Sequence, residues 1–410
     1  MDFQLAWRNI WRNPKRTGII LTAITIGVSA MITLASLSRG MAGGMVENAI
    51  DNLIGHIKIM NPEYRTDPDI SHRMDDYKEI VALAAPLLPE GSKLTRRIRV
   101  DAVAANARET VGVELVSIDP AMEAGVSFIS HAPVEGARIK KGDLRGVLMG
   151  AALAQKLQTG IGKKLVVTTQ KADGESGSRA FRIRGLFHAE MEATEKAFLF
   201  VTHQAAERLL GQKDIATEVA ITLPKGASDK EIAVVSQGIK EALAEAPVSV
   251  TTWRDLLPAI TAYLAMFDSF LIIWFVVIFI AMGFGIVNTI LMAVYERMRE
   301  FGLLKAIGMK PSRIIAMVLS ESIFLLVAGC ILGTALGVGF VWYFSQGGIN
   351  LGSFSQGTQM LGISRIIRPM IFQSDIIVAN AVVVILGGLV SIYPALKAAR
   401  FTPIDTMNQA

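Results

Sequence analysis

Four long apolar stretches, separated by polar segments, dominate the pattern of the chain. Each has about the 20 residues that an α-helix needs to cross the hydrocarbon core of a bilayer. Charged side chains inside these stretches are few and stand near their ends. The pattern therefore predicts four transmembrane helices, at residues 17–38, 267–295, 317–344 and 375–396.

Residues 39–266 form a polar insert of domain size, in which strand-like alternation mixes with helix-like periodicity. The strand-like segments are His56–Met60, Val111–Ile118, Leu165–Thr169, Phe181–Phe187, Ala197–Val201, Glu218–Leu223 and Val248–Thr251. The helix-like segments are Asp75–Leu88, Ala151–Leu157, His203–Leu210 and Asp229–Ala244. We expect a two-lobed α+β domain, inserted between the first and second helices and joined to them by helical stalks at Gly43–Leu53 and Trp253–Tyr263.

Basic residues decide the expected orientation. Lys and Arg gather in residues 1–16, in the loop 296–313 and in the tail 397–410, whereas the loop 345–374 carries only Arg365 and Arg368. Segments rich in Lys and Arg stay on the cytoplasmic side. Both termini are therefore expected in the cytoplasm, and the α+β domain is expected outside it.

The N-terminus has two readings. A cleaved signal peptide normally has an apolar core of about 7–15 residues. The run here is nearer 20, and the apolar residues of segment 1–16 lie largely on one helical face. We favour an uncleaved anchor that is preceded by a cytoplasmic interfacial helix.

Composition excludes several classes of protein. The chain is 51% hydrophobic, has a formal net charge of +5 and contains one cysteine, so disulfides and thiolate zinc clusters are not expected. No phosphate-binding G-x-x-x-x-G-K-[ST] motif, H-E-x-x-H motif or nucleophile elbow occurs. Acidic and histidine-containing loops read as solvated surface, and no basic patch with interleaved aromatics suggests nucleic acid. The chain is expected to be neither an enzyme nor a metal-binding protein.

The loop between the second and third helices is the most informative segment. It is short, has charged edges, and carries an apolar stripe of Phe301, Leu304 and Ile307. Such a helix suits docking into a groove of a partner protein. The same composition also suits binding to anionic lipid headgroups. The residues alone leave these alternatives open.

Three segments resemble the FtsX-like permease family of ABC transporters, which includes the LolC/LolE lipoprotein-release permeases, the MacB-type exporters and FtsX. Residues Glu296–Gly308 (ERMREFGLLKAIG) match the family signature nearly residue for residue. Leu5–Asn13 is similar to the N-terminal elbow of the family, and Tyr393–Met407 is similar to its closing segment. One span, a large insert and three further spans is also the layout of the family.

The resemblance implies a coupling helix that sits on a cytoplasmic ABC ATPase, which would carry the ATP and magnesium, so this chain would bind no cofactor directly. The missing phosphate-binding motif predicts that the ATPase is a separate subunit. The implied ATPase-coupling residues are Glu296, Arg297, Arg299, Glu300, Phe301, Gly302, Leu303, Leu304, Lys305, Ala306, Ile307 and Gly308. Among them the charged residues would contact the ATPase, and Phe301, Leu304 and Ile307 would be its buried anchors.

In lipoprotein-release relatives, acyl chains of the cargo lie between the outer ends of the first two spans. The matching residues here are Met31, Leu34, Leu37, Leu264, Phe267 and Phe270. The alternative is that they simply face lipid, as apolar residues of a span do by default.

A hairpin between Leu165–Thr169 and Phe181–Phe187 resembles the LolC hairpin that grips a periplasmic carrier. Its expected tip is 170–179, and the candidate partner-binding residues are Gln170, Lys171, Asp173, Gly174 and Glu175. The tip is polar and lacks apolar and proline residues, which favours a plain flexible hairpin.

Five residues inside the spans are expected to have structural roles. Gly329, Gly333 and Gly337 recur every four residues, which permits close helix approach, either within one subunit, which we favour, or at a dimer seam. Asn288 and Glu321 stand near membrane ends and are expected to cap or bridge helices.

Together these features predict a multi-pass permease of the bacterial inner membrane that extracts or releases lipoprotein or lipid cargo. Four helices enclose too little space for a large solute, so a second permease copy or a paralogue is expected as a partner. A periplasmic carrier or adaptor is a further expected partner. The alternatives are an FtsX-like signalling subunit that regulates a cell-wall hydrolase, and a MacB-like exporter subunit.

Overall fold

The computed structural model describes residues 13–350 and 366–401. Within them the chain divides into two compact units. One, called here the helical unit, comprises residues 13–43, 263–350 and 366–401, and the other, the α+β unit, comprises residues 44–262. Most of the expected N-terminal elbow, the middle of loop 345–374 and the end of the tail lie outside the described residues.

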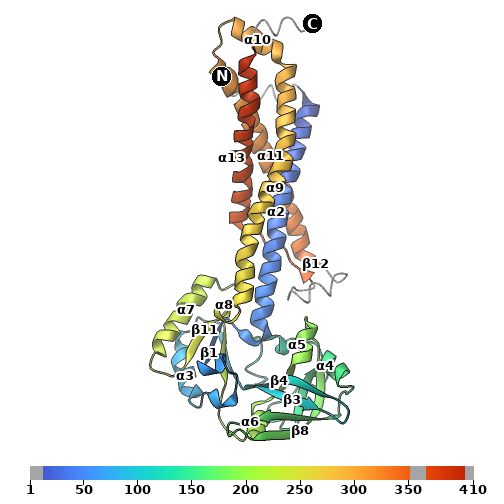
Figure 1. The fold of residues 1–410 in the computed structure, drawn as a ribbon, viewed down its shortest axis with the longest axis vertical. Coiled ribbons are helices and arrows are strands. Elements are labelled where there is room, and N and C mark those ends of the chain that lie inside the picture. Colours follow the sequence, from blue (N-terminus) through green and yellow to red (C-terminus); the bar gives the residue numbers. More distant parts are fainter. Residues whose placement is uncertain (1–12, 351–365, 402–410) are drawn as a thin grey trace. The chain divides into compact units, whose positions relative to one another are not determined.

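The helical unit contains four long helices, seen side by side in Figure 1. Each is long and apolar enough to cross a bilayer. All four expected spans are therefore present as helices, and all are longer than their apolar runs. The elements are α2 (Pro14–Ala49), α9 (Pro258–Glu296), α10 (Met298–Ala306), α11 (Pro311–Gly347), β12 (Ile349–Asn350), β13 (Ile366–Ile367) and α13 (Gln373–Arg400).

One prediction about the stalks was wrong in detail. The helical pattern from Trp253 to Tyr263 was expected to run on into the second span, but it splits at Leu257 into α8 (Trp253–Leu256) and α9. Pro258 is the first residue of α9, where its missing N–H costs no helical hydrogen bond. The other stalk, Gly43–Leu53, continues α2 to Ala49 as expected, and a π-type turn (Ile50–Ile54) follows, in which Asn52 and Leu53 leave helical geometry.

The glycine stripe of α11 packs against α2. A Cβ on Gly329 would lie 2.5 Å from Ile24 Cγ2, one on Gly333 would lie 2.7 Å from Val28 Cβ, and one on Gly337 would lie 3.2 Å from Ile32 Cβ. The missing side chains thus let the two helices approach closely. This supports the reading that the stripe packs within one subunit.

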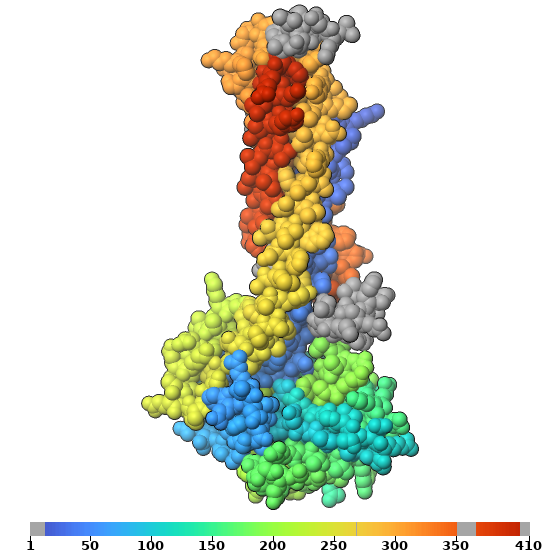
Figure 2. Space-filling model, viewed as in Figure 1, coloured from blue at the N-terminus to red at the C-terminus, as the bar shows by residue number. Residues whose placement is uncertain are grey.

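The outer face of α9 is uncovered. Its outward side chains include Ile272, Ile273, Trp274, Val277 and Phe284, the last of which is 75% exposed. Figure 2 shows α9, in yellow, along the face in view. Large apolar side chains left exposed on a span are what a lipid-facing helix requires, since lipid tails are as apolar as they are.

The α+β unit has two lobes, as expected. The smaller lobe is an antiparallel sheet in the order β11-β1-β10-β2, covered by α3 and α7. Its elements are β1 (Ile57–Met60), α3 (Tyr77–Ala84), β2 (Lys93–Arg97), β10 (Glu218–Thr222), α7 (Asp229–Ala242) and β11 (Ser249–Thr252). Ser228 and Glu231 form a capping box that starts α7.

The larger lobe is a sheet whose pairings close into a ring. The order is β5-β8-β6-β9-β4-β3-β7, and the long strand β8 pairs with β7 as well, which closes the ring around an apolar core. Its elements are β3 (Arg99–Ala105), β4 (Thr110–Ile118), β5 (Val134–Gly136), β6 (Gly146–Gly150), α4 (Ala151–Lys156), β7 (Lys164–Gln170), β8 (Ser176–Phe187), α5 (Glu192–Ala197), β9 (Phe198–Thr202) and α6 (His203–Leu210). The α+β unit also contains short 3-10 helices at Glu63–Arg65, Ile70–His72, Ala85–Leu87 and Phe128–Ser130.

His203 makes this lobe sensitive to acid. Its side chain is buried, and Nδ1 lies 2.7 Å from the Ser117 hydroxyl. Burial, aided by nearby Arg96, lowers its pKa to about 3. Since the unfolded chain takes up this proton near the ordinary pKa of about 6.5, stability falls as the pH drops from there toward 3.

We expect a loss of about 2 kcal/mol between about pH 7 and about pH 5 from this one group. Thermal unfolding of the detergent-solubilised chain at both pH values measures it. A His203→Gln variant cannot titrate and should lose most of this pH dependence. An equal dependence in the variant would assign the effect to other groups.

Candidate functional site

The segment that follows α9 is a short helix between two tight turns. Arg297 leaves helical geometry between α9 and α10, and Gly308 ends the segment with φ of +95°, a conformation that favours glycine. Met309 N donates to Leu304 O at 2.9 Å, and Pro311 begins α11. The expected helix within 296–308 is therefore present as α10.

The exposed apolar side chains of this segment are not those that were expected. Phe301 is 1% exposed and packs inside the helical unit, and Leu304 packs against the same core. Leu303 is 58% exposed and Ile307 is 76% exposed. The predicted stripe of Phe301, Leu304 and Ile307 was therefore wrong at two positions, because α10 turns its Phe301 side toward its own bundle.

Lys305 is also engaged within the chain. Its Nζ donates to Ala399 O at 2.7 Å and to Phe401 O at 2.8 Å, the free carbonyls at the end of α13. A cation at the C-terminus of a helix is stabilised by the helix dipole. Lys305 therefore holds α10 on α13, and Leu303 and Ile307 remain on the outer face.

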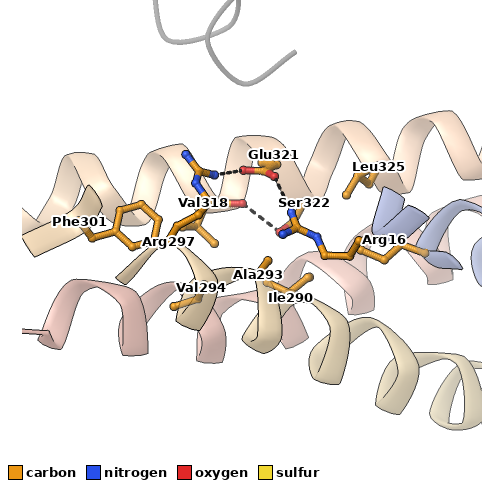
Figure 3. Close-up of a pocket in the computed structure, with 11 residues that line it drawn as sticks. Arg16, Ile290, Ala293, Val294, Arg297, Phe301, Val318, Glu321, Ser322 and Leu325 are labelled. Atoms are coloured by element: carbon orange, nitrogen blue, oxygen red, sulfur yellow. Dashed lines mark hydrogen bonds and ion pairs between the residues drawn. The ribbon is translucent and has the colours of Figure 1, made fainter. Parts of the chain in front are cut away.

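A chain of charged side chains ties this segment to its neighbours (Figure 3). Arg297 Nη1 donates to Glu321 Oε2 at 2.9 Å, and Arg297 Nε donates to Glu300 Oε2 at 3.1 Å. Arg16 Nη2 donates to Glu321 Oε1 at 3.3 Å, and Arg16 Nη1 donates to Glu296 Oε2 at 3.4 Å. Glu321 thus bridges helices, as expected from its position in the sequence.

This charged chain lies among apolar side chains. The guanidinium of Arg297 sits over the Phe301 ring at 5.3 Å. A small cavity of about 20 Å³ beside the charges is lined mostly by aliphatic residues, among them Ile290, Val294 and Leu325. The sequence predicted that Arg297 contacts the ATPase, but in the structure its side chain points into the helical unit and pairs with Glu321. Its proximity to the buried Glu321 was not readable from spacing.

At the other end of the helical unit, an apolar pocket of about 190 Å³ lies between α2 and α9. Three of the six residues predicted to contact cargo, Leu34, Phe267 and Phe270, line it. The other lining residues are Ser38, Tyr263, Met266, Leu271 and Trp274.

The remaining three predicted cargo residues do not line this pocket. Met31 is fully buried in the helix core, so it is not available to cargo. Leu37 and Leu264 are half-buried outside the pocket lining. The spacing of 263, 266, 267, 270, 271 and 274 marks one helical face, and that periodicity could have found the additional residues.

The expected hairpin of β7 and β8 is present, but its tip is shorter than predicted. The strands remain paired to Gln170 and Ser176, so the ladder continues into the segment that was expected to be the tip. Lys171 N donates to Glu175 O at 2.9 Å across the turn, and Glu175 N donates to Asp173 Oδ1 at 3.0 Å. Gly174 has φ of +83°. The tip is thus a tight polar turn of Lys171–Glu175 and not a long loop.

In the described part of the chain no three His, Cys, Asp or Glu residues gather as metal ligands would. The small sheet instead holds a buried network of charges that the sequence did not reveal. Lys58 Nζ lies 2.6 Å from Glu218 Oε2, and Arg97 contacts both Glu218 at 3.4 Å and Glu123 at 2.5 Å.

This network stays charged at neutral pH. Burial would raise the pKa of Glu218, but Lys58, Arg99 and Arg97 together lower it to about 2. Burial lowers the pKa of Lys58 to about 8, in spite of Glu218. The network joins β1, β2 and β10, so its role is to hold the sheet together.

Four helices fit to cross a bilayer, together with a two-lobed α+β unit, define a multi-pass membrane protein with a large polar domain. Two family models agree with this division. The FtsX-like permease C-terminal model matches residues 271–403, and the MacB-like periplasmic core domain model matches residues 17–234, more than half of the chain. The chain belongs to the FtsX-like ABC transporter permeases that have a MacB-like periplasmic core domain.

Curated relatives of two kinds span nearly the whole chain. The pyoverdine export ATP-binding/permease protein PvdT of Pseudomonas fluorescens is 24% identical over 99% of this chain and 59% of its own length. The lipoprotein-releasing system transmembrane protein LolC of Neisseria meningitidis is 22% identical over 96% of this chain and 94% of its own length. Across four of the curated relatives, MacB and PvdT proteins among them, the chain spans 17% to 59% of the relative's length.

Among solved structures, the periplasmic region of MacB from Actinobacillus actinomycetemcomitans aligns with 54% of this chain and 95% of that chain. The sequence identity is 10% and the TM-score is 0.35. At this TM-score the likeness adds nothing to the family assignment.

Proposed function

We propose that this chain is the permease subunit of an ABC transporter of the bacterial inner membrane that extracts or releases lipidated cargo. A separate cytoplasmic ATPase supplies ATP hydrolysis, two permease subunits assemble, and both termini face the cytoplasm. The α+β unit lies outside the cytoplasm, and ATP hydrolysis drives its movement through the membrane helices.

The apolar pocket between α2 and α9 is the observation that favours lipidated cargo. Its walls are aromatic and aliphatic apart from the hydroxyl groups of Ser38 and Tyr263, and Phe270 and Trp274 are about half-exposed. At about 190 Å³ it is smaller than the roughly 300–1,000 Å³ typical of drug-sized ligands. A pocket of this size and character suits part of an acyl chain, whose burial is favourable by about 0.8 kcal/mol per methylene.

The outer face of α10 is the proposed contact with the ATPase. Leu303 and Ile307 form a small exposed apolar patch next to the charged Arg299 and Glu300. An amphipathic helix that presents such anchors fits a groove of a partner protein. The anchors we propose are therefore Leu303 and Ile307, in place of Phe301 and Leu304.

MacB-like export is the second candidate, since the core-domain model and the PvdT relative both point to that branch. In that case the α+β unit would contact a periplasmic adaptor, and the cargo would be an exported compound. The same α10 contact with an ATPase would serve both functions, so the cargo distinguishes them.

Co-purification with the ATPase encoded next to this chain tests the proposal. The double variant Leu303→Asp, Ile307→Asp should reduce the bound ATPase at least tenfold, because a charge placed in an apolar contact loses its hydration (about 1.4 kcal/mol per factor of ten). Ile161→Asp, at an exposed isoleucine of the α+β unit, is the matched control and should retain the ATPase. If the wild-type chain retains no ATPase, the proposal fails.

Mass spectrometry of the same preparation identifies the cargo. Acylated lipoprotein or lipid should be enriched with the wild-type chain. It should be depleted in Leu34→Trp, which fills the pocket and leaves ATPase binding intact. Enrichment of a soluble adaptor or hydrolase without acylated cargo would instead assign export or signalling.

A further inference from the structure

Glu321 holds an unusual position in the helical unit. It belongs to α11, and its side chain is 10% exposed. Its two carboxylate oxygens accept from different elements, Oε2 from Arg297 just before α10 and Oε1 from Arg16 in the first turn of α2. One buried carboxylate thus connects the proposed ATPase-docking helix with the first transmembrane helix.

Stability alone is a weak reason for this arrangement. The side chains of Arg16 and Arg297 are 11% and 14% exposed, so three charges are largely withdrawn from water. Replacing a buried ion triad with apolar side chains of similar volume is often neutral or stabilising, by about 1–4 kcal/mol. The best-attested use of buried charges is to select between alternative arrangements of helices.

The observed arrangement leaves room for a second one. Arg16 Nε is buried and has no hydrogen-bond partner in the part of the chain that the structure describes. An unpaired buried donor costs about 1–3 kcal/mol. Arg16 and Arg297 each reach Glu321 through a single Nη, although a guanidinium can bind a carboxylate through two parallel N–H groups.

Arg297 has a second acceptor to move to. It already donates to Glu300 at 3.1 Å, and Glu300 is itself part of α10. If α10 moves away from Glu321, Arg297 moves with it and keeps Glu300, so Glu321 is left to Arg16, and a two-point pair would satisfy the free Arg16 Nε. That exchange would draw the start of α2 toward α11.

We propose that Glu321 is a positioning residue of the transport cycle, and that its carboxylate, shared by Arg297 and Arg16, carries a displacement of α10 to α2. The inference rests on the proposed docking of the ATPase on α10. It assigns Glu321 no contact with ATP or cargo.

The test compares two ways of removing the charge. Glu321→Gln leaves both arginines buried without their anion and should lower stability. The triple variant Arg16→Met, Arg297→Met, Glu321→Met replaces all three groups with apolar side chains and should restore stability. Ser322→Ala, in the same cavity lining but with a hydroxyl that donates to Val318 O of its own helix, is the matched control.

The readout is the motion itself. Spin labels at Ile19→Cys on α2 and Ile323→Cys on α11, both exposed positions, are placed in a Cys330→Ala background. Pulsed-EPR distances are measured in the full complex with the ATPase, with and without Mg-ATP. Bound ATPase and thermal midpoint are recorded for every variant.

We expect an ATP-dependent change of distance in the wild-type and Ser322→Ala complexes. The triple variant should be stable and retain its ATPase but show no change. A triple variant that is stable and shows the wild-type change of distance would mean that Glu321 has only a structural role. That result would overturn this inference and leave the proposed function standing. Absence of ATPase, or of any change, in the wild-type complex would remove the proposed function as well.

Discussion

Replacing Glu218 with glutamine should lower the stability of the small sheet by about 3–5 kcal/mol, because it leaves Lys58 buried without its anion. Lys58 is 4% exposed, Glu218 is 1% exposed, and their charged atoms lie 2.6 Å apart. Arg97 would keep Glu123 but lose its second carboxylate. Few single substitutions in this chain should cost more.

Hydrogen exchange of peptides from β1 and β10, read by mass spectrometry in the full detergent-solubilised chain, measures this loss locally. Glu114→Gln is the matched control, since Glu114 also pairs with an arginine, Arg99, but is about a quarter exposed. It should cost no more than about 1 kcal/mol. Equal costs at the two positions would mean that burial does not set the strength of these pairs.

A second variant, Lys58→Met with Glu218→Met, separates the charge from the packing. Apolar side chains of similar length remove both buried charges at once, so most of the stability should return. If the double variant is as unstable as Glu218→Gln, the hydrogen bonds of the network stabilise the small sheet, in addition to the neutralisation of Lys58 and Glu218 by each other.

The second large effect is expected at Gly333. A Cβ there would meet Val28 Cβ at 2.7 Å and Thr25 O at 2.9 Å, and the latter is backbone and cannot turn away. Gly333→Leu should therefore force α2 and α11 apart and cost about 3 kcal/mol, the upper end of the range for overpacking. The thermal midpoint in detergent and the yield of monodisperse protein measure it.

Gly339→Leu is the control on the same helix. In the described part of the chain, no atom other than the adjacent backbone of its own helix lies within 4 Å of its Cβ position, and its helix propensity should improve by up to about 1 kcal/mol. The control should be neutral or slightly more stable. If Gly333→Leu were equally harmless, the close packing of α11 on α2 would be wrong.

The positions of the four long helices follow from the sequence because apolar runs of sufficient length have one stable use in a bilayer. The helices α6 and α7 were also found nearly to the residue, since Thr202 and Ser228 cap them and their apolar residues recur at helical spacing. Some strands were harder to predict. Strands β2, β3 and β6 were missed, because β2 and β3 alternate few large apolar residues with charged or small ones, and β6 is an apolar run without alternation that leads directly into α4.

Helix α10 shows the limit of what local pattern predicts. A short helix within Glu296–Gly308 followed from the charged edges and Gly308, but the face that it presents did not. A stripe of Phe301, Leu304 and Ile307 is equally consistent with either side of α10 pointing outward. The contacts of Phe301 with the bundle and of Lys305 with the end of α13 decide the matter, and both join residues far apart in the chain.

The sequence by itself determined the family, the four apolar helices, the polar insert between the first two of them and the absence of a phosphate-binding motif from its 410 residues. These are properties of local composition and spacing. Only the tertiary structure decided that Glu321 receives both Arg16 and Arg297, that Glu218 receives Lys58 and Arg97, and that a pocket lies between α2 and α9. The energies of such pairs depend on burial and on distances of a few ångströms, which sequence separation does not encode.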